Sequence, residues 1–211
     1  MWEVGSGNVT KRKINGIINM MNINKELRNK LFWVSLVSII GLLIVLLRWN
    51  GRPWICECGN VRLWLGDINS SENSKHLFDP YSWTHLQHGL VFMLALSGLF
   101  RRLSIKVRLL LAMALESIWE LVENSATVIK SYQSNTVSMG YTGDTIINSL
   151  GDVLMCVIGF LLASKLGWKK TIVLFVIIEV LMLMTIRDSL ILNIVMPYFP
   201  IEDVLNWQRG G

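Results

Sequence analysis

The sequence has 211 residues with a formal net charge of +5; 52% of the residues are hydrophobic, 17% are charged, and the mean hydropathy is +0.46. A soluble domain of this length usually carries about a quarter charged residues, and here the charges gather between long apolar runs. This composition argues against a soluble enzyme and against a disordered chain, and it favours a membrane protein.

Five apolar stretches are long enough, some of them with polar interruptions, to cross a bilayer core, which needs roughly 20 residues per helix. In chain order they are Leu31–Leu47, His85–Phe100, Val107–Ile129, Thr145–Leu166 and Thr171–Ile194. The sequence therefore predicts an all-α, polytopic membrane helical bundle with about five transmembrane helices. One long loop, from Arg48 to Thr84, separates the first helix from the second.

Lysine and arginine are unevenly divided between the two sides of these stretches. Thirteen precede the first stretch or follow the second and fourth, and seven fall on the other side. Because cytoplasmic loops carry the Lys and Arg excess, the N-terminus is predicted inside and the C-terminus and long loop outside. Residues 1–30 then form a basic cytoplasmic segment, and residues 31–211 form a single integral membrane domain.

On this interpretation the basic run Lys11–Lys13 is a topology signal and not a nucleic-acid site. The expected partners are membrane lipids, with no nucleic acid, and the sequence leaves the oligomeric state open. The long outer loop also holds Cys56 and Cys58. Thiols there can oxidise, but a disulfide between residues two apart is strained. An unusual turn disulfide, a second metal-binding pair and two free thiols all remain open.

Polar side chains recur at helical spacing in four of the five stretches. Spacings of three and four residues place them on one helix face, and at 1.5 Å per residue they all reach the outer half of the bilayer. The residues are His85 and His88 in the second stretch, Glu116, Glu120 and Glu123 in the third, Asp144, Asn148 and Asp152 in or just before the fourth, and Arg187 and Asp188 in the fifth.

Acids outnumber cations in this set, because six acids accompany one arginine and two histidines. An acid near the bilayer centre costs roughly 2.5–3.5 kcal/mol, so either several carboxyls are protonated or a cation lies among them. Two imidazoles one turn apart, facing carboxylates, suit a divalent metal, with zinc the most expected. The alternative is a metal-free cluster in which histidine is the general base and a carboxyl is the acid.

These residue types suggest separate roles within one site. We expect His85, His88 and Asp144 to bind the metal, Glu120, Glu123 and Asp152 to be catalytic, and Arg187 and Asn148 to bind substrate. The planar guanidinium of Arg187 suits an anionic headgroup. The predicted function is hydrolysis or group transfer on a lipid or lipid-linked envelope substrate at the outer leaflet.

The competing hypothesis is a non-enzymatic membrane protein that holds a cation with the same cluster. It would be an ion or proton pathway, or an envelope assembly or binding factor. A pathway needs polar groups that reach the inner face, and Glu179 is the one acid at a similar depth on the inner half. This distribution favours a one-sided site.

Several polar segments of the chain are distinctive. They are C-E-C-G at 56–59, H-L-Q-H-G at 85–89, E-S-I-W-E-L-V-E-N-S at 116–125 and Y-T-G-D at 141–144. Together they resemble a family of small bacterial inner-membrane proteins known as domain of unknown function 2585, of the UPF class. The resemblance covers about residues 55–208 and implies a multi-pass protein of the bacterial cytoplasmic membrane.

A second, more distant resemblance rests on two helices. An E-x-x-W-E helix followed by a helix with Asp, Asn and Asp at every fourth position is similar to VanZ-like membrane proteins. Neither family brings an established reaction, so the chemistry rests on the residues themselves.

Overall fold

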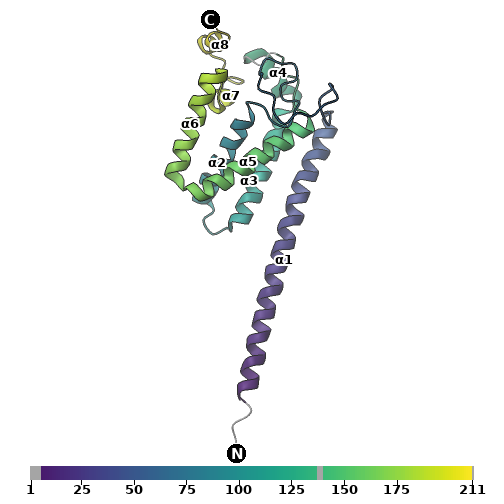
Figure 1. The fold of residues 1–211 in the computed structure, drawn as a ribbon, viewed down its shortest axis with the longest axis vertical. Coiled ribbons are helices and arrows are strands. Elements are labelled where there is room, and N and C mark those ends of the chain that lie inside the picture. The colour runs from purple at the N-terminus through teal and green to yellow at the C-terminus, as the bar shows by residue number, and fades with distance from the viewer. Residues whose placement is uncertain (1–5, 137–139, 211) are drawn as a thin grey trace, which may run out of the picture. The chain divides into compact units, whose positions relative to one another are not determined.

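The computed structural model describes residues 6–136 and 140–210; in the N-terminal helix it describes the side chains of Ile23 and of residues 25 onward. Over these residues the chain is α-helical without a β-strand, apart from one isolated bridge between Trp64 and Phe78, so the all-α expectation is confirmed. Figure 1 shows the helices α1 (Ser6–Trp49), α2 (Ser82–Leu99), α3 (Ile105–Glu123), α4 (Ala126–Asn135), α5 (Ile146–Leu166), α6 (Trp168–Ile186), α7 (Leu190–Val195) and α8 (Glu202–Gln208).

The chain divides into two compact units, Met1–Ser38 and Ile39–Gly211. The first contains the N-terminal part of α1, and the side chains of Lys11–Lys13 lie outside the described residues. Within the described part, two helical segments are long and apolar enough to cross a bilayer, Lys25–Trp49 and Ile146–Leu166. By length and composition, therefore, two of the described helical segments could span a membrane, whereas five were expected from the sequence.

The second unit is built around the pair α2 and α5, which α3 and α6 flank. Gly89 of α2 lies against the backbone of Cys156 and Phe160, and Gly159 of α5 lies against the backbone of Leu86. A β-carbon at either position would overlap those backbone atoms. Glycine thus allows the two helices to approach closely enough for their polar side chains to meet, as small residues do in membrane bundles.

Two of the predicted stretches are each divided into two helices. The third ends at Glu123, because Ser125 accepts a hydrogen bond from Val128 N–H and begins α4. The fifth ends at Ile186, where Arg187 adopts a left-handed conformation with φ 55°. Ser189 then caps α7. Side-chain caps of this kind provide hydrogen-bond acceptors for the first N–H groups of a helix. At both places a new helix therefore begins although the apolar sequence pattern continues.

The loop between α1 and α2 packs against the beginning of α5. The N–H groups of Ile146 and Ile147 donate to the carbonyls of Pro53 and Trp54, at 2.9 and 3.2 Å, and Thr145 N–H donates to Ser74 O at 3.1 Å. These are the helix N–H groups that have no partner inside the helix. The loop is therefore attached to the end of the unit where α2 and α5 begin and α3 ends.

Candidate functional site

The histidines of α2 face the last two turns of α3. His85 Nδ1 lies 2.6 Å from Glu116 Oε1 and 3.3 Å from Glu120 Oε1, and His88 Nδ1 lies 3.0 Å from Glu116 Oε2. On its other side, His85 Nε2 lies 3.9 Å from Asp152 Oδ2 of α5. Three helices thus bring one imidazole between three carboxylates, and all of these side chains are buried.

Glu116 is fully buried and lies within hydrogen-bond distance of both histidines. A carboxylate hydrogen-bonded to one ring nitrogen fixes the ring orientation, and the other nitrogen can then bind a metal. Metal-binding histidines are commonly supported in this way. Helical spacing places Glu116 on the correct helix face but gives it no role in the site. The structure makes it the closest partner of both rings.

Glu120 is the least satisfied polar group of the cluster. Its side chain is fully buried, and neither carboxylate oxygen accepts a hydrogen bond from the described part of the chain. Glu123 Oε2 also lacks a partner among these residues. A buried carboxylate without hydrogen bonds is strongly unfavourable unless it is protonated or paired with a cation. These oxygens therefore mark the point in the cluster where a proton or a cation is needed in addition to the His85 contact.

A cavity of about 30 Å³ lies beside His85, lined in part by Glu123, Asp144, Asn148 and Asp152. A water molecule needs roughly 10–15 Å³ of such volume, so the cavity has room for an ion or for one or two waters. No Lys or Arg lines it among the described residues. Within residues 6–136 and 140–210, the buried side-chain nitrogen of Asn148 also has no hydrogen-bond partner.

Asp144 lies at the edge of this cavity, on the segment that leads into α5. Its carboxylate accepts hydrogen bonds from Asn124 Nδ2 at 2.6 Å and from the Tyr141 hydroxyl at 3.0 Å, and its N–H donates to Asn124 Oδ1 at 2.7 Å. Asn124 thus binds both the backbone and the side chain of Asp144. The carboxylate is fixed in place by neutral donors, which leave its negative charge available to a cation.

Asp79 was not among the residues predicted for the site. It lines the cavity, and its carboxylate accepts from the N–H groups of Ser74 and Tyr81 at 3.1 and 2.7 Å. Burial, reinforced by the charge of Asp144, raises the pKa of Asp79 above its ordinary value. Ser82 connects Asp79 to the cluster, since its hydroxyl accepts from Asp79 N–H at 3.2 Å and donates to Asp152 Oδ1 at 2.7 Å.

Arg187 lies away from this cluster. It is exposed at the end of α6, and its guanidinium donates to Trp207 O at 3.0 Å. It does not line the cavity. The seven other predicted site residues contact one another or share the cavity wall, so Arg187 is the one that the structure does not bring to them.

Within the buried His/Glu/Asp cluster, two sets of side chains have the spacing of metal ligands. Nitrogen and oxygen atoms of His85, His88 and Glu116 lie within 4.8 Å of one another, and so do those of His85, Glu120 and Glu123. His85 belongs to both sets. The mixture of imidazole and carboxylate suits zinc or another divalent transition metal.

Comparison with known proteins gives a family without a described activity. The model of a family described as "Protein of unknown function (DUF2585)" matches residues 47–210. No solved structure matches the chain. The VanZ-like resemblance stays an expectation, because none of these comparisons tests it.

Several related proteins are named UPF0314 proteins. The chain is 39% identical to that of Sphingopyxis alaskensis over 179 residues, which is 85% of this chain and 95% of the relative. For the relatives from Sinorhizobium fredii and Paracoccus denitrificans the identities are 41% and 42%, and each match covers 87% of this chain and 94% of the relative. The chain therefore belongs to the DUF2585 family of uncharacterised proteins, together with these UPF0314 proteins.

Proposed function

We propose that the chain is a multi-pass protein of the bacterial cytoplasmic membrane whose buried His/Glu/Asp cluster holds a divalent metal, with zinc favoured by the ligand chemistry, and hydrolyses or transfers a group on a lipid or lipid-linked envelope substrate. The observation that carries this proposal is the state of Glu120. This fully buried carboxylate accepts no hydrogen bond from the described residues and lies 3.3 Å from a histidine that also contacts Glu116. A cation bound there supplies the missing charge.

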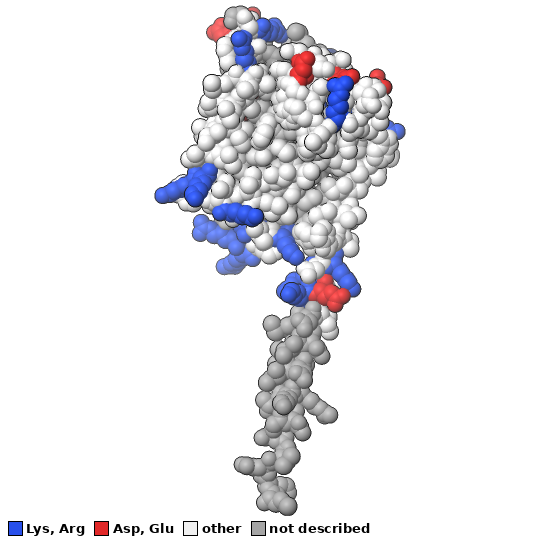
Figure 2. All heavy atoms as spheres, viewed as in Figure 1, with Lys and Arg blue, Asp and Glu red and all other residues white. Residues whose placement is uncertain are grey.

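The proposed membrane location is supported by the distribution of polar and apolar side chains, which is the reverse of that in a typical soluble protein. The acids and histidines of the cluster are buried, or in the case of Glu123 partly buried, whereas many large apolar side chains are exposed on α3, α5 and α6, for example Leu115, Ile118, Leu154, Val176 and Leu181. Exposed apolar surfaces of this extent mark contact with lipid or with other proteins. Figure 2 shows that on the visible face of the second unit the charged side chains gather at the two ends and leave the middle without charge.

In this proposal α1, α2, α3, α5 and α6 cross the membrane, and the Lys and Arg distribution places the N-terminus inside. The loop between α1 and α2 is then outside, with Cys56 and Cys58. After reduction, an impermeant thiol reagent is expected to label these cysteines in intact cells. Labelling that occurs only in inverted membrane vesicles would reverse the orientation. Cys156, which is buried in α5, is the internal control and should stay unlabelled in both preparations.

The residues of the cluster divide into separate roles. A bound divalent ion supplies Lewis-acid chemistry. His85, His88 and Asp144 are proposed as its ligands, while Glu120, Glu123 and Asp152 take and return protons next to it. Asn148 has an unused buried donor that lines the same cavity and suits a substrate oxygen. Arg187, exposed at the end of α6, is proposed to bind an anionic headgroup outside the cluster.

Isosteric neutral variants test the catalytic acids. Glu123→Gln and Asp152→Asn remove a charge but little volume, so the protein should insert and stay folded while activity falls about 10–100-fold, as expected for residues that support a metal centre. Glu179→Gln is the matched control. Glu179 of α6 is also buried, but it accepts hydrogen bonds from Gln87 Nε2 and Leu190 N–H and does not line the cavity that Glu123 and Asp152 line.

The measurement is lipid mass spectrometry of cells that lack the protein and of cells that carry each variant. Loss of the protein should make one lipid or lipid-linked species accumulate, and wild type and Glu179→Gln should restore the normal profile. Glu123→Gln and Asp152→Asn should not. If these two variants restore the profile as fully as the wild type, or if no species accumulates, the non-enzymatic alternative is favoured.

A further inference from the structure

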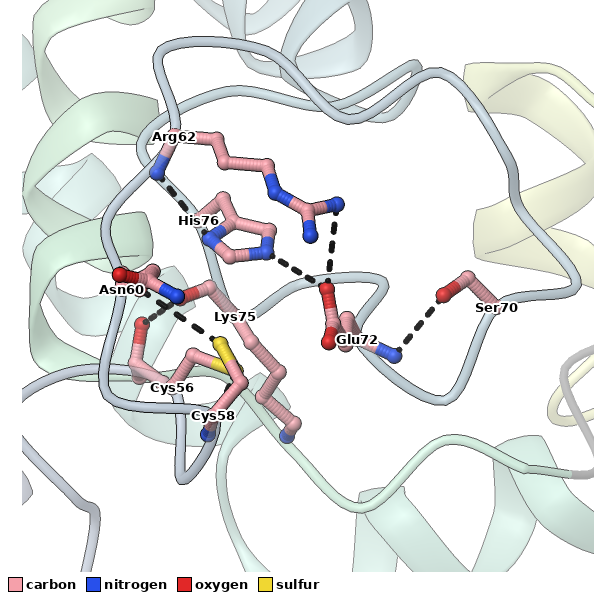
Figure 3. Close-up of a disulfide and its surroundings, with 9 residues drawn as sticks. Cys56, Cys58, Asn60, Arg62, Ser70, Glu72, Lys75 and His76 are labelled. Atoms are coloured by element: carbon pink, nitrogen blue, oxygen red, sulfur yellow. Dashed lines mark hydrogen bonds and ion pairs between the residues drawn. A yellow bond between two sulfur atoms is a disulfide. The ribbon is translucent and has the colours of Figure 1, made fainter.

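A second group of reactive side chains lies in the loop between α1 and α2. Figure 3 shows the Cys56–Cys58 disulfide there, with Lys75, His76 and Glu72 beside it. The Cα atoms of the two cysteines are 5.1 Å apart, within the usual range for a disulfide. The turn closes at Gly59, whose N–H donates to Cys56 O and whose φ is +77°.

The two sulfur atoms of this disulfide are not equivalent. Cys58 is exposed, whereas Cys56 is 5% exposed. The N–H of Cys58 donates to Cys56 Sγ at 3.2 Å. In thiol–disulfide exchange an attacking thiolate needs access to one sulfur, and the other sulfur leaves faster when its thiolate is stabilised. Here the accessible sulfur is Cys58, and the stabilised leaving group is Cys56.

A structural role explains this disulfide poorly. A disulfide stabilises a protein mainly by restricting the unfolded chain, and the restriction grows with the number of residues in the closed loop. Cys56 and Cys58 are separated by a single residue. The bridge therefore restricts the unfolded chain about as little as a disulfide can.

The disulfide also opens onto a cavity of the size that a ligand or peptide side chain needs. The cavity has a volume of about 580 Å³, and its wall includes both cysteines together with Arg52 and Lys75. Burial lowers the pKa of Lys75, and the nearby Asp144 opposes that shift. Nearby cationic side chains favour the thiolate form of cysteine, but Glu57 and Glu72 line the same wall and offset these two cations. The hydrogen bond from Cys58 N–H to Cys56 Sγ is therefore the contact that stabilises the leaving sulfur.

Both ring nitrogens of the neighbouring His76 have partners other than the cysteines. His76 Nδ1 accepts a hydrogen bond from Arg62 N–H at 3.2 Å. In the neutral ring Nε2 then carries the proton, and it lies 3.1 Å from Glu72 Oε2, which also pairs with the Arg62 guanidinium at 3.3 Å. The four side chains are close enough to form a metal site, but the histidine nitrogens are already hydrogen-bonded to Arg62 and Glu72.

We propose that Cys56–Cys58 is a redox-active disulfide that oxidises a dithiol of a second protein on the outer side of the membrane. A thiolate of the partner attacks Cys58 Sγ, the Cys56–Cys58 bond breaks, and Cys56 leaves as a thiolate. The partner's second thiolate attacks the mixed disulfide and releases Cys58. The partner loses two electrons and becomes a disulfide, Cys56 and Cys58 gain them, and the two protons of the partner's thiols end on the two cysteines.

The first test uses the purified full-length protein in detergent and a short peptide with two cysteines as the reductant. Mass spectrometry should show one peptide disulfide formed for each Cys56–Cys58 pair reduced, reversibly, in the folded protein. Buried Cys156 should remain unmodified. A disulfide that the peptide reduces only after unfolding would overturn the proposal, and so would two free thiols holding a metal in protein purified without reductant.

Single cysteine variants test the direction of attack. With oxidised glutathione as the probe, Cys56→Ser leaves the exposed Cys58 and should form a mixed disulfide at least about 10-fold faster than Cys58→Ser, which leaves the buried Cys56. Equal rates would contradict the assignment. Protein purified in detergent has no inner or outer side, so the result of the glutathione test does not depend on the membrane topology. The proposed topology is tested separately, by the thiol labelling of cells.

Discussion

Replacing Gly89 with alanine is expected to prevent stable folding of the helical unit. The new β-carbon would overlap the carbonyl oxygen of Cys156 and lie 2.6 Å from the backbone nitrogen of Phe160. Because the clashing atoms belong to the backbone, a change of side-chain rotamer cannot relieve the overlap, and α2 and α5 must move apart. We expect a loss of at least about 3 kcal/mol, the upper end for overpacked sites, measured as thermal unfolding of the detergent-solubilised protein.

Gly98→Ala is the matched control on the same helix. A β-carbon at Gly98 meets no described atom within 4 Å. Alanine is a better helix former than glycine by about 1 kcal/mol, so this variant should be as stable as the wild type or slightly more stable. If Gly89→Ala unfolds at the same temperature as Gly98→Ala, then α2 and α5 are not packed as closely as the structure has them.

The second large effect is expected from Glu116→Ala. Glu116 is fully buried and is the carboxylate closest to both His85 and His88. Its removal leaves two buried imidazoles without this partner, and breaking a buried pair in this way costs about 3–5 kcal/mol. The free energy of unfolding should fall accordingly in the absence of added metal.

Glu123→Ala should behave differently, although it removes the same chemical group from the same helix. Glu123 is partly buried, and one of its oxygens has no hydrogen-bond partner in the described part of the chain. Truncation removes a like charge from an acidic cluster, so the stability should change by about 1 kcal/mol or less. If both variants lose the same stability, Glu116 has no special supporting role.

Much of the helical fold is predictable from the sequence, because each long apolar run overlaps a long helix of the structure. The end of α5 and the beginning of α6 follow from Gly167, whose φ is +74°. The breaks after Glu123 and Ile186 were missed. At both places the hydropathy continues, and a serine shortly after the break caps a new helix.

The helical part of the site is also predictable, since spacings of three and four residues fix which side chains share a face. Spacing together with the expected depth in the bilayer predicts that His85, Glu120 and Asp152 lie at one level, and the structure has the histidine within 3.3 and 3.9 Å of the two carboxylates. The spacing cannot predict the distance between helices. That distance is set by glycines such as Gly89, which no polar pattern identifies.

The loop residues of the site could not be found by spacing. Asp79 and Tyr141 reach the cavity or its acids through turns, which have no periodicity. The one available signal for Asp79 was its position shortly before His85, in a loop too long to be only a connection. Arg187 was misplaced relative to the cluster because its helix ends just before it.

Elemental analysis of the purified full-length protein tests most directly whether the buried cluster of the second unit binds a divalent cation. We expect about one divalent ion per chain, bound tightly enough to survive purification, because folding and metal binding are coupled at such centres. His85→Gln should lose the ion while remaining folded, and Glu179→Gln should keep it. Wild-type protein that carries no divalent metal, and takes up none from a zinc-buffered solution, would contradict the proposed metal centre.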